Sequence, residues 1–249
     1  MLGEEDYDTF LQGSYRNYTA LAHINDVDIV ARRKMTNSPL SPSQWVSLFN
    51  SIATRLQASS RISGAVSLGD KCVKLKGTSL NADIVPAVAV GDFAKDPVAI
   101  WSRGKRSERP NYPRTHYSNG VKKQARTSDS YKPTVRLLKR WAQQYFETSV
   151  TAPSFYIECA VHQAADSSFS EYLPLSFVRV GREICSWSRS KVLYSVAGDK
   201  DVLVPSEWHP ERFEIFKAKL RPDLSLVVQA MQAATTGEAN RLWKLAFGN

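Results

Sequence analysis

Three aspartates of the sequence, Asp26, Asp28 and Asp83, have neighbours that suit metal-dependent chemistry. Asp26 and Asp28 alternate with apolar residues in "NDVDIV", so an extended strand would project both carboxylates from one face, about 6–7 Å apart. Asp83 stands inside the apolar stretch "NADIVPA". Buried carboxylates raise each other's pKa, and a divalent cation removes that cost. Magnesium prefers carboxylates, phosphates and water, and two such ions stabilise the attacking and leaving oxygens of a phosphoryl displacement.

A second pair of residues, Gly13 and Ser14, suits phosphate binding. A glycine lets the backbone approach a phosphate closely, successive N–H groups in a turn bind an anion, and Ser14 adds a hydroxyl donor. For an isolated Asp-x-Asp pair, exposed strand-end acids with no shared role are the alternative interpretation. A Gly-Ser turn, then an Asp-x-Asp strand, then a further aspartate among apolar residues favours a shared site for metal and phosphate.

The elements that must position these residues follow from hydrophobic spacing. Strands are predicted at "VDIVAR", at "AVSLGDKCVKLKG" as a strand–turn–strand, and at "LNADIVPAVAV", where Pro86 indicates an edge strand or a strand end. Helices are predicted over residues 41–59 and 131–147, at "APSFYIECAVHQAA" and in the chain after His209. Residues 94–130 are expected to form a long connection with little regular structure. Strands followed by helices predict an α+β protein with two lobes.

The composition narrows the class of protein. The chain has 249 residues, a formal net charge of +9 and three widely spaced cysteines. No apolar run approaches the roughly 20 residues of a membrane helix. The sparse cysteines fit reduced thiols in a cytoplasm and argue against a structural zinc site. Lys and Arg outnumber acids between residues 103 and 132, which fits either a solvated basic surface or a partner such as a nucleoside triphosphate or nucleic acid.

Several stretches resemble a known family. "LQGSYRNYTAL", "NDVDIV" and "NADIVPAV" resemble the nucleotidyltransferase core of the DNA polymerase β superfamily and, more narrowly, the bacterial cGAS/DncV-like nucleotidyltransferases (CD-NTases). "NYPRTHYSNGVKKQART", "YKPTVRLLKRW", "APSFYIE" and "GDKDVLVPSEW" follow in the order and approximate spacing of that family. The resemblance implies a two-lobed polymerase β-like α+β fold. A mixed-sheet core lobe over residues 1–130 and a helical lobe over residues 131–249 would together form the active-site cleft.

The resemblance also implies roles for residues of the core lobe. Gly13 and Ser14 would hold the donor triphosphate. Asp26 and Asp28 would bind two Mg²⁺ ions, for which Mn²⁺ could substitute. Asp83 would complete the metal site and activate the attacking ribose hydroxyl.

Four residues of the helical lobe are implied as nucleotide-binding. Arg136 and Lys139, one helical turn apart, would reach the phosphates. Ser154 and Phe155 match a stretch in which relatives place a phosphate-binding hydroxyl and an aromatic ring that stacks on a base.

The implied activity is metal-dependent joining of nucleoside triphosphates into a cyclic di- or trinucleotide second messenger, with release of pyrophosphate, in bacterial anti-phage (CBASS) signalling. A regulatory protein or nucleic acid stays open as a further partner, no membrane is expected, and the expected location is the cytoplasm. Two alternatives remain. One is a nucleotidyltransferase that modifies RNA or protein, which the basic segment supports. The other is a catalytically silent nucleotide- or RNA-binding module, against which the three intact acids argue.

Overall fold

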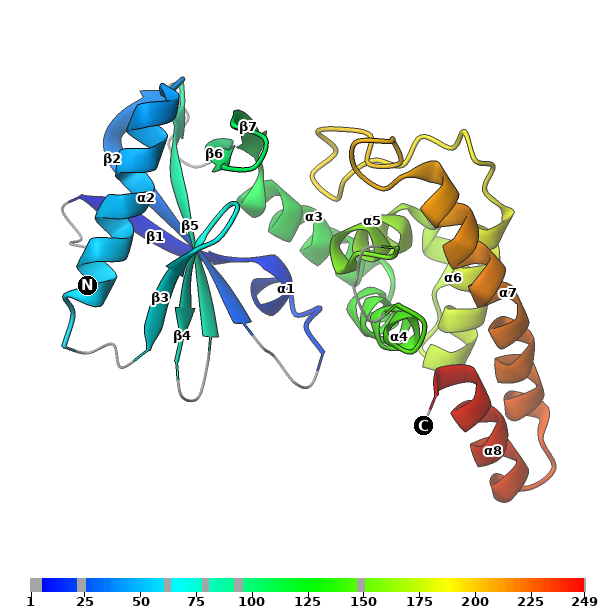
Figure 1. Cartoon of the computed structure of the whole chain (residues 1–249). Coiled ribbons are helices and arrows are strands. Elements are labelled where there is room, and N and C mark those ends of the chain that lie inside the picture. The colour runs from blue at the N-terminus through cyan, green and yellow to red at the C-terminus, as the bar shows by residue number, and fades with distance from the viewer. Residues whose placement is uncertain are drawn as a thin grey trace. The chain divides into compact units, whose positions relative to one another are not determined.

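The protein divides into two compact units. The computed structural model describes residues 6–21, 26–60, 64–77, 81–91, 96–146 and 151–248 (Figure 1). Contacts within the chain divide it into Met1–Tyr117 and Ser118–Asn249. This boundary lies earlier in the chain than the one expected after residue 130. Among the helices of the described ranges, none has the length and apolar character that a membrane span requires. A strand-containing unit followed by a helical one confirms the predicted α+β class.

One mixed sheet forms the base of the N-terminal unit. In the described residues its seven strands are β1 (Tyr7–Gln12), β2 (Asp26–Ser38), β3 (Ala65–Leu68), β4 (Val73–Lys76), β5 (Asn81–Val90), β6 (Val98–Ser102) and β7 (Ser107–Asn111). The main path through the sheet is β1-β2-β5-β4-β3, and β6 and β7 extend it from β5. β2 and β5 run parallel, whereas the other pairs are antiparallel. The predicted strand–turn–strand is the β3–β4 hairpin.

Helix α2 (Pro42–Gln57) covers one face of this sheet (Figure 1). It begins where the sequence predicts, because the Ser41 hydroxyl accepts from the Gln44 N–H while the Gln44 side chain accepts from the Ser41 N–H. Its buried side chains follow the predicted helical spacing and are Trp45, Leu48, Phe49, Ile52 and Leu56. They pack against Ile84 and Val88 of β5, which fixes the face of that strand that is covered.

The opposite face of the sheet carries a smaller apolar cluster. Val30 of β2 and Val85 of β5 belong to it, with Phe10 of β1 packed against them. Because successive side chains of a strand point to opposite faces, Asp28 and Asp83 share this face with Val30 and Val85. The acids therefore project from the side of the sheet that α2 leaves uncovered.

The prediction that Pro86 marks an edge strand or a strand end was wrong, because β5 is a central strand. On one side β5 pairs with β2 along its length, with Pro86 opposite Ala31. On the other side its register pairs with β4 end at Ile84, and those with β6 begin at Ala87. Pro86 lies between these two partners, at a position where a missing N–H costs the ladder little.

The C-terminal unit is helical. It contains α4 (Tyr131–Gln143), α5 (Ser154–Gln163), the short 3₁₀ helix η1 (Asp166–Ser168), α6 (Leu173–Ser186), α7 (Pro210–Gln232) and α8 (Thr236–Phe247) (Figure 1). Trp141 lies at the centre of its core and contacts Tyr145 and Phe216. The Trp141 indole and the Tyr145 hydroxyl both donate to Asp223 of α7, at 2.8 and 2.7 Å. The helix predicted over 131–147 is present as α4 but ends at Gln143, and Glu147 lies outside the described residues. Helices are also present after His209, as predicted, whereas α6 was not predicted.

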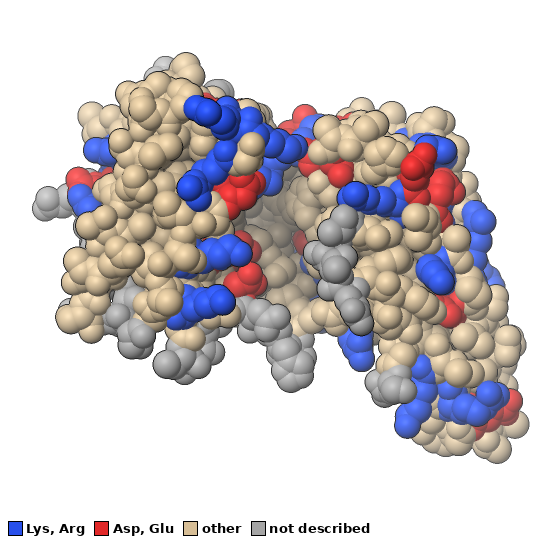
Figure 2. Space-filling model, viewed as in Figure 1, with Lys and Arg blue, Asp and Glu red and all other residues tan. Residues whose placement is uncertain are grey.

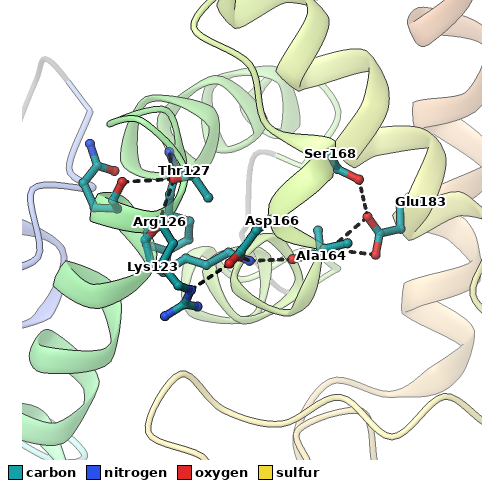
Figure 3. A network of polar contacts seen from close by, with 10 residues as sticks. Lys123, Arg126, Thr127, Ala164, Asp166, Ser168 and Glu183 are labelled. Atoms are coloured by element: carbon teal, nitrogen blue, oxygen red, sulfur yellow. Dashed lines mark hydrogen bonds and ion pairs between the residues drawn. The ribbon is translucent and has the colours of Figure 1, made fainter.

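The expectation of a long irregular connection over residues 94–130 was also wrong. Within it the described chain forms β6, β7 and helix α3 (Pro113–Arg126). Few apolar side chains mark α3, which is held by polar contacts instead (Figure 3). The buried Lys123 ammonium donates to the Ala164 carbonyl at 2.6 Å and to Asp166, and Arg126 Nε donates to Asp166 at 2.7 Å.

Candidate active site

Strand pairing brings the predicted acids together. β2 and β5 lie side by side in parallel, with Asp28 directly opposite Asp83 and Asp26 opposite Asn81. Asp26 and Asp28 are two residues apart on one strand, so all three carboxylates lie on the uncovered face. The sequence predicted that the acids would be close, but only the register makes Asp28 and Asp83 direct neighbours.

The pKa of Asp28 shows how unfavourable a negative charge is at this site. Burial, followed by the neighbouring carboxylates of Asp26 and Asp83, raises the pKa of Asp28 from its ordinary value of 3.8 to about 6. An ionised Asp28 is therefore destabilising unless positive charge arrives. This electrostatic deficit is what a metal ion or a cationic ligand would offset.

The Gly-Ser turn lies against the same carboxylate. β1 pairs with β2 so that Gln12 is opposite Asp28, and the short helix α1 (Gly13–Arg16) begins at the next residue. Gly13 has a φ of +70°, and a Cβ added there would lie 2.0 Å from Asp28 Oδ2. Both the backbone conformation and the close approach require glycine. The Ser14 carbonyl accepts from the N–H groups of Thr19 and Ala20, at 2.9 and 3.1 Å, which fixes the turn.

Cys72 is a neighbour of the acids that the sequence did not indicate. Burial and the carboxylate of Asp83, to which the thiol hydrogen-bonds, raise the pKa of Cys72 to about 12. The thiol therefore stays protonated and donates to Asp83. The predicted β3–β4 hairpin placed Cys72 near a turn, but the register that brings it to Asp83 is a tertiary feature.

The acids fit a magnesium site by their chemistry. The donor set consists of carboxylate oxygens, which this hard cation prefers, and the raised pKa of Asp28 reflects unbalanced negative charge. In the part of the chain that the structure describes, no group of three or more His, Cys, Asp or Glu side chains is placed to hold a metal ion without further ligands. Magnesium commonly takes one or two carboxylates and completes its shell with substrate phosphates and water.

The other predicted site residues, Arg136, Lys139, Ser154 and Phe155, belong to the C-terminal unit. Arg136 on α4 is half-buried. Lys139 is only 4% exposed and donates to Glu158 of α5 at 3.1 Å. Ser154, the first residue of α5, is exposed, and Phe155 is 40% exposed. Their nucleotide-binding roles stay predictions.

Comparison with known proteins gives matches to both units. Residues 118–221 match the profile described as the cGAS/DncV-like nucleotidyltransferase C-terminal helical domain. The chain is 28% identical over 195 residues to a cyclic nucleotide synthase (CdnE01) of Staphylococcus haemolyticus, which covers 65% of this chain and 65% of that protein. It is 24% identical over 239 residues to a cyclic UMP-AMP synthase of Rhodothermus marinus, covering 84% of this chain and 81% of that protein. The chain thus spans just under two thirds of the length of the staphylococcal relative.

The fold is similar to solved structures. The structure of the Rhodothermus marinus c-UMP-AMP synthase with Apcpp and Upnpp aligns with a TM-score of 0.72 and 25% identity, over 87% of this chain and 84% of that one. The Vibrio cholerae cyclic AMP-GMP synthase DncV aligns with a TM-score of 0.74 and 18% identity, over 98% of this chain and 69% of that one. The first of these structures holds nucleoside triphosphate analogues.

Proposed function

Since the chain belongs to the cGAS/DncV-like nucleotidyltransferase family, we propose that it joins nucleoside triphosphates into a cyclic di- or trinucleotide and releases pyrophosphate. The observation that carries this proposal is the contact between the Gly13 backbone and the Asp28 carboxylate, beside the Asp28–Asp83 pair. A phosphate-binding turn and three acids on one sheet face are what transfer of a nucleotidyl group needs. The product's role as a second messenger in bacterial anti-phage signalling and a cytoplasmic location belong to the same proposal.

Residues of the N-terminal unit have separate roles in the proposed reaction. Gly13 and Ser14 present backbone N–H groups and a hydroxyl to the donor triphosphate. Asp26, Asp28 and Asp83 would hold Mg²⁺, which supplies positive charge to the transferring phosphoryl group when bound. Positioning of the two substrates and electrostatic stabilisation then account for most of the rate.

Each linkage forms one bond to phosphorus and breaks another. The acceptor's ribose hydroxyl oxygen bonds to the donor's α-phosphorus, and the bond from that phosphorus to the bridging oxygen breaks. Pyrophosphate leaves with the bridging oxygen. The hydroxyl proton passes to Asp83 and then to solvent, and the hydrogen bond from Cys72 helps to orient the Asp83 carboxylate.

The test is synthesis from defined substrates. The protein is incubated with Mg²⁺ and each pair of α-labelled triphosphates, and the products are treated with phosphatase and identified by mass spectrometry. We expect a phosphatase-resistant cyclic product that Asp28→Asn and Asp83→Asn abolish. Asp129→Asn is the matched control, because it makes the same chemical change at an exposed residue of a turn. Asp129 has a φ of 60°, which asparagine adopts readily. In a parallel reaction RNA or protein is added. Label that appears only on the added RNA or protein would favour a nucleotidyltransferase that modifies it and refute cyclic nucleotide synthesis.

A further inference from the structure

Two lysines share the sheet face of the three acids. In the register between β4 and β5, Lys74 is opposite Asp83 and Lys76 is opposite Asn81. Directly opposed side chains lie on one face, with Cβ atoms about 5 Å apart. Val73, between Cys72 and Lys74, points the other way into the cluster under α2. Both lysines are exposed, and Figure 2 shows basic side chains next to acidic ones on the surface of the N-terminal unit.

Among the described residues, no acid is paired with the ammonium group of either lysine. Within the described ranges, neither Lys74 nor Lys76 forms an ion pair or a hydrogen bond, although Lys74 stands directly opposite Asp83. The Lys74 side chain extends along Gly69 instead, where its Cε lies 3.1 Å from the position that a Cβ would take. By contrast, Arg32 on the same face is occupied by Asp8 at 2.7 Å.

The order of strands places these lysines on the side of the acids opposite to the Gly-Ser turn. Gly13 and Ser14 lie on the β1 side of Asp28, whereas Asp83 on β5 separates Asp28 from the lysines on β4. In a phosphoryl displacement the attacking and leaving oxygens lie roughly in line with the phosphorus. A donor triphosphate held on the β1 side therefore places the attacking ribose beyond Asp83, toward β4.

We propose that Lys74 and Lys76 bind the 5′-phosphates of the acceptor nucleotide and so select an acceptor that carries phosphates over one that does not. The inference rests on the proposed function, since it assigns a role to residues next to the same acids. The lysines act as positioning residues: they take no part in bond making or breaking, and each supplies up to three donors and one positive charge. Removing such a charge-assisted contact at an exposed site should weaken acceptor binding about tenfold.

The experiment varies the phosphates of the acceptor and the lysines together. Two acceptors are compared, both with the base that the product assay identifies. One is a nucleoside, and the other is its α,β-methylene triphosphate, which can accept a nucleotidyl group but cannot donate one. With a labelled triphosphate as donor, the wild type should show a KM about tenfold or more lower for the triphosphate acceptor. The double change Lys74→Ala and Lys76→Ala should abolish this preference. It should leave the donor KM and the rate with the nucleoside acceptor unchanged.

Two further variants separate this role from a structural one. Lys74→Arg with Lys76→Arg should restore most of the preference, since the positive charge and donors return. Lys105→Ala removes one exposed positive charge from the turn between β6 and β7 and should leave the preference intact. The effect of the double alanine variant should also weaken at high salt.

The proposal is overturned if the double alanine variant loses activity equally with both acceptors, raises the donor KM, or keeps the wild-type preference. A wild-type protein that forms no linkage with any pair of triphosphates would refute the proposed function instead. In that case calorimetry with the α,β-methylene triphosphate alone still tests the lysines. The double variant should then bind one equivalent fewer than the wild type, and equal stoichiometry and affinity would refute their phosphate-binding role.

Discussion

Replacing Asp28 by asparagine should stabilise the metal-free protein at neutral and alkaline pH. The pKa of Asp28 rises in the fold from 3.8 to about 6, chiefly through burial and then through Asp26 and Asp83. A tenfold change in proton affinity corresponds to about 1.4 kcal/mol, so an ionised Asp28 costs up to about 3 kcal/mol. Because the residue keeps some solvent exposure, screening should reduce this cost to about 2 kcal/mol. Asparagine retains the shape of the side chain and removes the charge.

The sign of the effect follows from the raised pKa. Below about pH 4 the carboxyl is protonated in the folded protein and largely so in the unfolded chain, so Asp28→Asn and wild type should be nearly equally stable. As pH rises through about 6, folded wild type must ionise Asp28 beside two other acids and loses stability. Urea unfolding in the presence of EDTA, followed by circular dichroism at about pH 4 and pH 8, measures the difference.

Controls decide whether the charge is the cause. Asp129→Asn should shift the free energy of unfolding by less than about 0.5 kcal/mol at both pH values, because its carboxylate is exposed. Millimolar Mg²⁺ should stabilise wild type at pH 8 and stabilise Asp28→Asn much less. An Asp28→Asn protein that is no more stable than wild type at pH 8, or that differs from it equally at both pH values, would refute the electrostatic reasoning.

Other changes test the fold around the site. Gly13→Ala should lower turnover at least about 100-fold and the melting temperature by several degrees, because its Cβ would meet Asp28 Oδ2 at 2.0 Å and its φ is +70°. Lys123→Ala should cost about 2–3 kcal/mol in urea unfolding because its ammonium is buried, whereas Arg126→Ala, exposed in the same network, should cost less than about 1 kcal/mol. Ser41→Ala should cost about 1 kcal/mol by loss of the helix cap, and an unchanged urea midpoint would contradict that role.

The parts of the fold that local pattern determines were predicted well. Helix α2 has both a cap at Ser41 and apolar side chains at helical spacing, so its limits and its buried face could be predicted. The alternation around Asp26 and Asp28 likewise sufficed to place both on one strand face.

The parts of the fold that tertiary contacts determine could not be predicted from local pattern. Helix α3 has few apolar side chains and contains Gly120, and the bonds from Lys123 to residues about forty positions away hold it. The position of Pro86 between β4 and β6 depends on where two other strands begin and end. For the same reason the alignment of Asp28, Asp83 and Lys74 across three strands is invisible until the register is known.

The buried cysteines have a practical consequence for labelling. All three thiols are free and buried, and burial raises the pKa of each, so few thiolates are available to alkylating reagents at neutral pH. Maleimide dyes should therefore leave the native chain almost unmodified. A cysteine introduced at an exposed helical position, such as Val46 on α2, would then carry a single fluorophore against a silent background. The wild-type sequence is in this sense already prepared for single-molecule spectroscopy.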